Sequence, residues 1–385
     1  MNLFIFYTSF SVNWKISRHK KQMTVPAEWW LKRDKKIGSG SYGNIYTIRD
    51  DPFYVMKKIH CTGCEDFLFI QREIDCLKLL KGEPNVIQLL DDILIENRMV
   101  QGKCVKCGGE CSSPDEPHHD IYLLLPRYDC DLNMYLDERE QDKAQRPFDL
   151  NERMNIFRQI ARGLKSCHDK GVVHRDLKPP NILVGKKGDT DYPDIVLADF
   201  GLSFILNGIQ SKQPINKRQK KQQIASYYSE RVGTSNYRAI EFSMLHDEDV
   251  GKVQQNGSMD IWSLGCICFE IFDPRNRILF GGTVDAEIWR DMLCAVSNDL
   301  EQVERILSEK DARYFSKYNW GTIAKEFWRL ISDDGPTGLR FLTIKHRIQS
   351  MKGILTTDQF KLWTTGMFAF EPNDRCLIDE ILLVF

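Results

Sequence analysis

The segment His174-Arg175-Asp176-Leu177-Lys178-Pro179-Pro180-Asn181 lies directly after a predicted long helix, Asn151 to His168. The carboxylate of Asp176 can accept the proton of an incoming hydroxyl group. Lys178 can neutralise the charge of a phosphate, and Asn181 can supply an oxygen to a metal ion. Together these three side chains indicate a loop built for phosphoryl transfer.

Two further stretches extend this chemistry on either side of the loop. Downstream, Asp199-Phe200-Gly201 follows an apolar strand, Ile195 to Ala198, and offers a carboxylate of the kind that Mg²⁺ prefers. Upstream, the run Gly38-Ser39-Gly40-Ser41-Tyr42-Gly43 lies between β-prone residues, where missing side chains let backbone N–H groups approach phosphates. Alone, this spacing is equally consistent with an ordinary turn. A strand rather than a helix follows it, which favours a hairpin folded over a nucleotide.

A lysine and a glutamate stand between these motifs. Lys57 lies towards the end of a predicted strand, Tyr54 to Ile59, and Glu73 lies on a predicted helix, Asp66 to Lys81. A lysine can hold the α- and β-phosphates of a nucleotide only if a carboxylate fixes its ammonium group. Taken singly, a surface lysine and a solvated glutamate are the simpler interpretation. Their place in the ordered set of motifs favours the functional one.

This ordered set resembles the eukaryotic-type protein kinase family, from about Leu31 to the C-terminus. The resemblance implies an α+β, two-lobed fold. Residues 1–28 would form an N-terminal extension, and residues 29–126 a small, β-rich lobe with one helix. Residues 127–385 would form a larger, mainly α lobe with an extended activation segment, 205–230.

The same resemblance implies a role for each site residue. The catalytic set would be Asp176 as the base, with Lys178, Lys57, Glu73, Asn181 and Asp199, the last two holding Mg²⁺. ATP would contact the glycine loop, a gatekeeper and hinge, a ribose-binding carboxylate and an apolar adenine site, namely Ile37, Gly38, Gly40, Gly43, Ile45, Val55, Lys57, Leu125, Tyr128, Asp131 and Leu183. Asp260 would brace the catalytic loop, and Arg375 would pair with Glu241.

Several residues resemble one subgroup of the family. Lys178 and Thr234 are typical of serine/threonine kinases, and the run Tyr237-Arg238-Ala239 resembles the cyclin-dependent and mitogen-activated kinases. Ile240 replaces the proline usual in that group, which affects the shape of the substrate-binding loop and not the catalytic atoms. The elaborated loops are typical of a divergent, virus-encoded or protist enzyme.

The activation segment carries two features of its own. The basic run Lys217 to Lys221 indicates either a solvated loop or a patch for nuclear import or an acidic partner. Arg175, next to the base, is typical of kinases governed by phosphorylation of this segment, because a buried arginine requires an anionic partner. Ser229 stands at the position that the subgroup uses, with Ser226 and the tyrosines Tyr227 and Tyr228 as rivals.

Two Cys-x-x-Cys pairs, Cys61 with Cys64 and Cys104 with Cys107, are not explained by the resemblance. Their spacing lets both thiolates of a pair reach one Zn²⁺ ion at about 2.3 Å. In a kinase fold the neighbouring strands would be antiparallel, so both pairs would meet at the outer tip of the small lobe in a structural zinc site. Four free thiols or a redox pair remain alternatives.

Composition limits the partners. The 385 residues include 53 Lys and Arg against 54 Asp and Glu, so no global charge draws the chain to nucleic acid or anionic lipid. The apolar stretch Leu3 to Tyr7 is far shorter than the ~20 residues of a membrane span. We therefore expect neither a nucleic acid nor a membrane as partner. Cysteines within apolar runs, such as Cys266 and Cys268, agree with an intracellular location, cytoplasmic with nuclear entry.

The sequence thus predicts an active serine/threonine protein kinase that moves the γ-phosphoryl group of Mg·ATP to a protein hydroxyl. Its partners would be protein substrates and an activating subunit or upstream kinase. A kinase-shaped scaffold without activity is one alternative, but all the metal-binding and base residues are present. A small-molecule kinase on a similar fold is another, against which the Tyr237 to Ala239 run and Thr234 argue.

Overall fold

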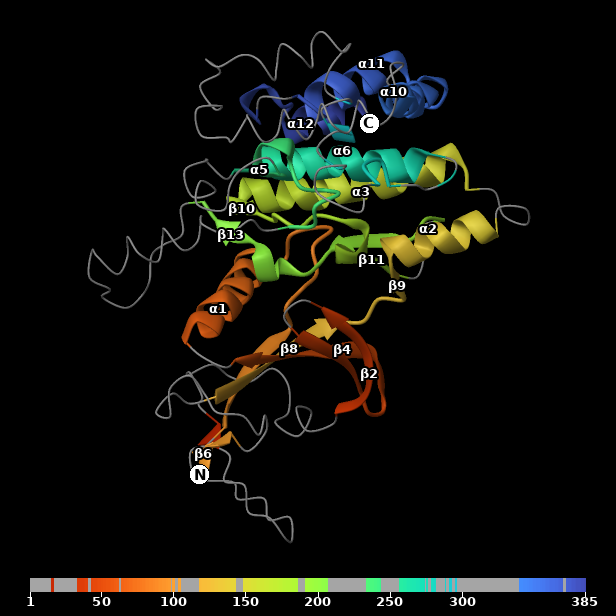
Figure 1. Cartoon of the computed structure of the whole chain (residues 1–385). Coiled ribbons are helices and arrows are strands. Elements are labelled where there is room, and N and C mark those ends of the chain that lie inside the picture. The colour runs from red at the N-terminus through yellow and green to blue at the C-terminus, as the bar shows by residue number, and fades with distance from the viewer. Residues whose placement is uncertain are drawn as a thin grey trace, which may run out of the picture. The chain divides into compact units, whose positions relative to one another are not determined.

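The computed structural model (Figure 1) describes residues 15–16, 33–40, 43–61, 64–97, 99–100, 103–104, 118–142, 148–185, 191–206, 233–243, 256–273, 275, 278–281, 288, 291–292, 295, 339–369 and 372–385. The chain divides into two compact units. One contains residues 1–81 and 87–127, and the other contains residues 82–86 and 128–385. No helix within the described ranges is long and apolar enough to cross a membrane.

The first unit is built on an antiparallel sheet of six strands in the order β1-β5-β8-β4-β3-β2. The strands are β1 (Lys15–Ile16), β2 (Arg33–Gly40), β3 (Gly43–Ile48), β4 (Asp51–Cys61), β5 (Asp91–Asn97) and β8 (His118–Pro126), and a small hairpin joins β6 (Met99–Val100) to β7 (Lys103–Cys104). The one helix among this unit's described residues is α1 (Cys64–Leu79). Its buried face presents Ile70, Ile74 and Leu77 at helical spacing. The predicted small, β-rich lobe is confirmed.

The second unit is mainly helical. Its elements are β9 (Cys130–Asp131), α2 (Leu132–Gln141), α3 (Leu150–Asp169), β10 (Val172–Val173), β11 (Ile182–Gly185), β12 (Asp194–Leu197), β13 (Phe204–Ile205), α5 (Ile240–Ser243), α6 (Ser258–Phe272), α10 (Leu339–Ser350), α11 (Thr357–Lys361), a π-helical turn (Leu362–Met367) and α12 (Ile378–Val384). Together the two units give the predicted α+β kinase fold.

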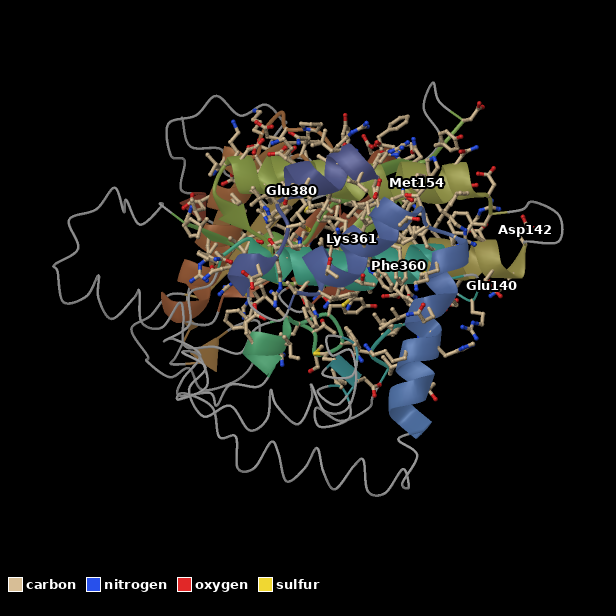
Figure 2. The ribbon with its side chains drawn as sticks, turned by 90° about the horizontal axis from the view of Figure 1, so that it is seen from above. Glu140, Asp142, Met154, Phe360, Lys361 and Glu380 are labelled. Atoms are coloured by element: carbon tan, nitrogen blue, oxygen red, sulfur yellow. The ribbon has the colours of Figure 1, made fainter. Side chains whose placement is uncertain are left out.

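The core of the second unit forms around α6, whose residues from Met259 to Phe272 are all buried. Helix α3 lies beside α6 (Figure 1) and buries an apolar face that includes Ile156, Phe157, Ile160 and Leu164. Helix α12 packs on α3; Figure 2 looks down on these helices and on α11, with Met154, Phe360 and Glu380 marking α3, α11 and α12. This packed layer supports the short strands and loops that carry the candidate site.

One predicted strand is wrong in its first half. The apolar run Val86 to Ile95 predicts a single strand, but the strand β5 begins only at Asp91. Asn85 has a left-handed backbone (φ 55°) and its carbonyl accepts from Leu197 N at 2.9 Å, so Val86 forms an isolated bridge to Leu197 in the second unit. This non-local hydrogen bonding overrides the apolar pattern of the run.

Some of the predicted helices are present in the structure, and others cannot be compared with it. Apolar periodicity predicts helices over 151–168, 258–272 and 357–368, and α3, α6 and α11 each begin within one residue of these starts. The same periodicity predicts helices over 285–294 and 300–308, which lie mostly or wholly outside the described residues. Strand β2 and helices α2, α10 and α12 are not among the elements that the sequence pattern predicts.

Candidate active site

In the first unit, Lys57 and Glu73 form a buried ion pair. The Lys57 Nζ atom lies 2.6 Å from Glu73 Oε1, and both residues are at least 95% buried. Strand β4 supplies the lysine and helix α1 the glutamate, so the pair also ties the helix to the sheet. A charge-assisted hydrogen bond of this length fixes the direction of the ammonium group. The predicted partnership of these two residues is present.

The glycine loop is the β2–β3 hairpin, in which Gly38 pairs with Ile45 and Gly40 with Gly43. A side chain at Gly43 would bring its Cβ within 2.6 Å of the Lys58 carbonyl oxygen. Glycine is therefore required at this position by the packing of β3 on β4, quite apart from any phosphate. The tip of the hairpin, residues 41 and 42, lies outside the described residues.

The predicted adenine contacts fall in both units. In the first, Val55 and Leu125 are cross-strand partners and buried, while Ile37 is 47% exposed and Ile45 is half-buried. In the second, Leu183 pairs with Asp131 across β11 and β9. In each unit, some of the predicted ATP contacts therefore lie on strands that pair with one another.

Asp131, the predicted ribose ligand, has a second role in the second unit. Its Oδ1 atom accepts a hydrogen bond from Met134 N at 2.9 Å and so caps the N-terminus of α2. Tyr128, at the end of the predicted hinge, contacts the position of Gly185, where a Cβ would lie 3.0 Å from the tyrosine ring. Burial raises the pKa of Tyr128 to about 12, so its hydroxyl stays neutral.

The carboxylate of Asp176 is held on both oxygens. Its Oδ1 atom accepts from the backbone N and the side-chain Oγ1 of Thr234, each at 3.0 Å. Its Oδ2 atom accepts from Asn181 Nδ2 at 3.0 Å and lies 2.8 Å from Lys178 Nζ. Lys178 Nζ also donates to Thr234 Oγ1 at 2.7 Å. The predicted base, lysine and threonine therefore form one hydrogen-bonded cluster.

The catalytic loop is anchored to α6 through Asp260. This fully buried carboxylate accepts from the backbone N–H groups of His174 and Arg175, each at 2.9 Å, and from His168 Nε2 at 3.0 Å. Burial acts to raise the pKa of Asp260, but the hydrogen bonds and electrostatic effects of His168 and His174 together outweigh it, so the pKa is lowered. The carboxylate therefore stays ionised and braces the loop as predicted.

Asn181 and Asp199 come together at one end of the β11–β12 pair. Ile182 pairs with Leu197, and Ala198 N donates to Asn181 O at 2.9 Å, so the residues just beyond this register are neighbours. Asn181 Nδ2 donates to Asp176, which leaves Asn181 Oδ1 as the atom for a metal ion. A carboxylate and an amide oxygen are hard ligands that suit Mg²⁺. The donor set fits the predicted ion.

The substrate-binding loop is fixed to the same cluster. Gly233 has φ +87°, and a Cβ there would lie 2.6 Å from the Arg175 carbonyl oxygen, so only glycine fits. Ile240, which replaces the usual proline, is fully buried. The predicted Arg375–Glu241 pair is present and bidentate, with distances of 2.8 and 2.6 Å.

Sequence reasoning missed one contact beneath this loop. Tyr237 is buried and hydrogen-bonded to Glu270 of α6. Burial raises the pKa of Glu270 to about 8, although the hydrogen bond from Tyr237 and the charge of Arg347 oppose the shift. A glutamate in the apolar run of α6 is the only signal in the sequence that could have pointed to it.

The cysteine prediction is tested only in part. Strands β4 and β8 are antiparallel neighbours as expected, and Cys61 ends β4. Cys104 lies in the hairpin strand β7, whereas Cys107 lies outside the described residues. Within the described part of the chain, no group of three or more histidine, cysteine or acidic residues could hold a metal ion. The zinc site gains no support from the structure and stays a prediction.

The predicted features of the activation segment fall mostly outside the described residues. These features are the basic run at 217–221 and the phosphorylation candidates Ser226, Tyr227, Tyr228 and Ser229. The described parts of the segment are 199–206 and 233–241. Phosphorylation of the segment therefore stays a prediction.

Comparison with known proteins agrees with this geometry. A family model described as the protein kinase domain matches residues 31–382, so the chain belongs to the protein kinase family. Within that family it is similar to kinases of the cyclin-dependent type.

Three relatives illustrate the similarity. "Cell division control protein 2 homolog 1" of Trypanosoma brucei brucei is 29% identical over 279 residues, which is 68% of this chain and 75% of that protein. "Cyclin-dependent kinase B2-1" of Oryza sativa subsp. japonica is 27% identical over 259 residues, 66% of this chain and 65% of that protein. A protein of Acanthamoeba polyphaga mimivirus, provisionally named a serine/threonine-protein kinase, is 28% identical over 275 residues, 70% of this chain and 40% of that protein.

Proposed function

We propose that this chain is an active kinase that transfers the γ-phosphoryl group of Mg·ATP to a serine or threonine hydroxyl of a protein substrate. The observation that supports this best is the Asp176 cluster. A buried carboxylate bonded to Thr234, Lys178 and Asn181 is oriented before any substrate arrives. Positioning and charge carry most of this reaction, and the cluster supplies both.

In the proposed reaction, Asp176 orients the acceptor hydroxyl and takes its proton as the oxygen attacks the γ-phosphorus. The bond between the γ-phosphorus and the bridging oxygen of the β-phosphate breaks, and ADP leaves. Lys178, 2.8 Å from the same carboxylate, offsets the negative charge that develops on the phosphate. Asp199 and Asn181 Oδ1 would hold Mg²⁺, which when bound neutralises the phosphate oxygens. Lys57, directed by Glu73, would bind the α- and β-phosphates.

Both alternatives conflict with particular observations. An inactive scaffold has no need of a lysine, base and metal-ligand set, yet here each of these residues is engaged by a specific partner. A small-molecule kinase would not require a peptide-binding loop, yet Thr234 of this loop is hydrogen-bonded to Asp176, and Gly233 lies close to the Arg175 carbonyl oxygen. The bond between Thr234 and the base favours serine and threonine as acceptors.

Proteins are the proposed substrates, and an activating subunit or an upstream kinase is a proposed partner. The name of one relative, "Cyclin-dependent kinase B2-1", favours the subunit. We retain an intracellular location as a proposal from composition. A structural Zn²⁺ held by the two cysteine pairs is a separate proposal, and it does not affect the transfer reaction.

The test is incubation of the purified full chain with γ-labelled ATP, Mg²⁺ and a peptide library. Wild type should label serine or threonine peptides, and Asp176→Asn should not. Lys165→Gln is a matched control, because that lysine lies away from the Asp176 cluster and forms partly exposed pairs with Asp169 and Asp379 in the same unit. An enzyme that binds ATP but labels no peptide would support the scaffold, and phosphorylation of a metabolite mixture alone would support the small-molecule kinase.

A further inference from the structure

Arg175, beside the base, has an unusual backbone. Its φ of 66° is uncommon for a residue with a side chain and costs of order 1 kcal/mol. The hydrogen bond from its N–H to Asp260 helps to hold this conformation. As a result the side chain turns back towards the segment that follows Asp199. The residue is only 7% exposed, so its charge needs partners within the protein.

Two of these partners are uncharged. The Nε atom of Arg175 donates to the carbonyl oxygen of Leu202 at 2.6 Å. The guanidinium carbon lies 5.1 Å from the ring centroid of Phe204, within the range of a cation–π interaction. Phe204 is 5% exposed, so this interaction takes place away from water, where it is strongest.

The backbone of Phe204 is itself held in place. Phe204 pairs with Val173 in the short antiparallel ladder between β13 and β10. Next to it, Ser203 Oγ donates to His174 O at 3.1 Å, and the His174 Nε2 atom lies 3.0 Å from Ala198 O. Phe204 therefore stands on a rigid connection between the catalytic loop and the Asp199 segment.

Arg175 is also in contact with the residues that orient the base. Its carbonyl oxygen lies so close to Gly233 that a Cβ there would approach to 2.6 Å. The next residue, Thr234, makes two hydrogen bonds to Asp176 Oδ1. A shift of Arg175 would therefore move either the base or the threonine that binds it.

We propose that Phe204 is a positioning residue for phosphoryl transfer, which acts by holding the guanidinium group of Arg175. This inference rests on the proposed kinase function. It adds a support for Arg175 that does not depend on a phosphate. An aromatic ring at this position keeps the catalytic loop and the Asp199 segment together in the unmodified protein.

A double-mutant cycle tests the coupling. In the full chain, Phe204→Leu should lower kcat about tenfold, equivalent to about 1.4 kcal/mol, and leave the KM for ATP within about twofold. Phe204→Tyr keeps the ring and should retain most of the wild-type kcat. In an Arg175→Gln background, Phe204→Leu should change kcat by less than about twofold, because the interaction is already absent.

A matched control separates positioning from packing. Phe157 of α3 is a fully buried phenylalanine of the same unit that packs on Phe272 and Phe385. Phe157→Leu should lower the thermal midpoint without lowering kcat of the folded enzyme. If Phe204→Leu does not fold, Phe204→Met, which also lacks the ring, takes its place.

Amide hydrogen exchange gives a readout that needs no activity. Phe204→Leu should speed exchange at residues 174–176 and 234, and Phe157→Leu should not. Equal losses of kcat in both Arg175 backgrounds, or unchanged exchange at these amides, would overturn the inference. Absence of transfer by wild type would instead refute the proposed function, and the exchange measurement would then decide the inference alone.

Discussion

Replacing Asp260 by asparagine should both destabilise the folded protein and slow phosphoryl transfer. The carboxylate is fully buried and accepts three hydrogen bonds, from the backbone of His174 and Arg175 and from His168. Oδ2 accepts two of these and Oδ1 accepts one. In Asp260→Asn, one of the two positions becomes an NH₂ group that cannot accept.

The cost follows from the orientation that loses least. The NH₂ group would face Arg175 N–H, so that the remaining oxygen keeps the bonds from His174 and His168. One hydrogen bond to a charged acceptor is then lost, about 1.5–3 kcal/mol, and two buried donors face each other, about 1–3 kcal/mol more. We expect a loss of about 3–5 kcal/mol of unfolding free energy, or roughly 6–20 °C in thermal midpoint.

Calorimetry and kinetics on the same preparations measure both effects. The activity of the folded Asp260→Asn enzyme should fall about tenfold or more, because the backbone just before the base loses an anchor. Asp169→Asn is the matched control: Asp169 is 56% exposed and paired with Lys165, so its loss should cost at most about 1 kcal/mol.

The pH dependence gives an independent check. The pKa of Asp260 in the folded protein lies below its ordinary value of 3.8, so the ionised carboxylate stabilises the fold fully above that pH. The difference in stability between wild type and Asp260→Asn should shrink as the pH falls below about 4. A difference under about 0.5 kcal/mol at neutral pH, or one that does not shrink well below about pH 4, would refute the bracing role.

Three further predictions follow from the site. Lys57→Met should abolish transfer, whereas Lys58→Met, which loses a 3.2 Å ion pair with Asp120, should keep most of it; the reverse pattern in the peptide assay would mean that the lysine is misassigned. Asp199→Asn should leave the thermal midpoint nearly unchanged and remove Mg²⁺-dependent transfer, since an amide holds Mg²⁺ poorly; near-wild-type turnover would contradict the metal assignment. A strong chelator should lower the thermal midpoint if zinc is bound, with Cys61→Ser reproducing the effect, and elemental analysis that finds no zinc would end that hypothesis.

The chemistry of the site could be predicted from the sequence because each of its motifs is local. His174 to Asn181 and Asp199 to Gly201 each place several functional groups within a few residues. The Lys57–Glu73 pair could be predicted from the order of one strand and the helix that follows it. Apolar periodicity likewise predicted α3 and α6, which bury long continuous faces.

Contacts between residues far apart in the chain could not be predicted in the same way. The end of the strand-like pattern at Asn85 depends on a hydrogen bond with Leu197. The requirement for glycine at position 43 depends on the carbonyl of a neighbouring strand. Neither residue's own sequence neighbourhood contains this information.

The sequence by itself determined the family and the two-lobed fold, and it predicted the set of residues that would bind Mg·ATP and take the proton, because these depend on the kinds of side chain and their order. Only the tertiary structure decided how the base is held: Thr234 reaches Asp176 from 58 positions away, and Phe204 reaches Arg175 from beyond the Asp199 segment. The physical reason is that hydrogen bonds and ring contacts need distances of a few ångströms, which chain folding sets and sequence spacing does not.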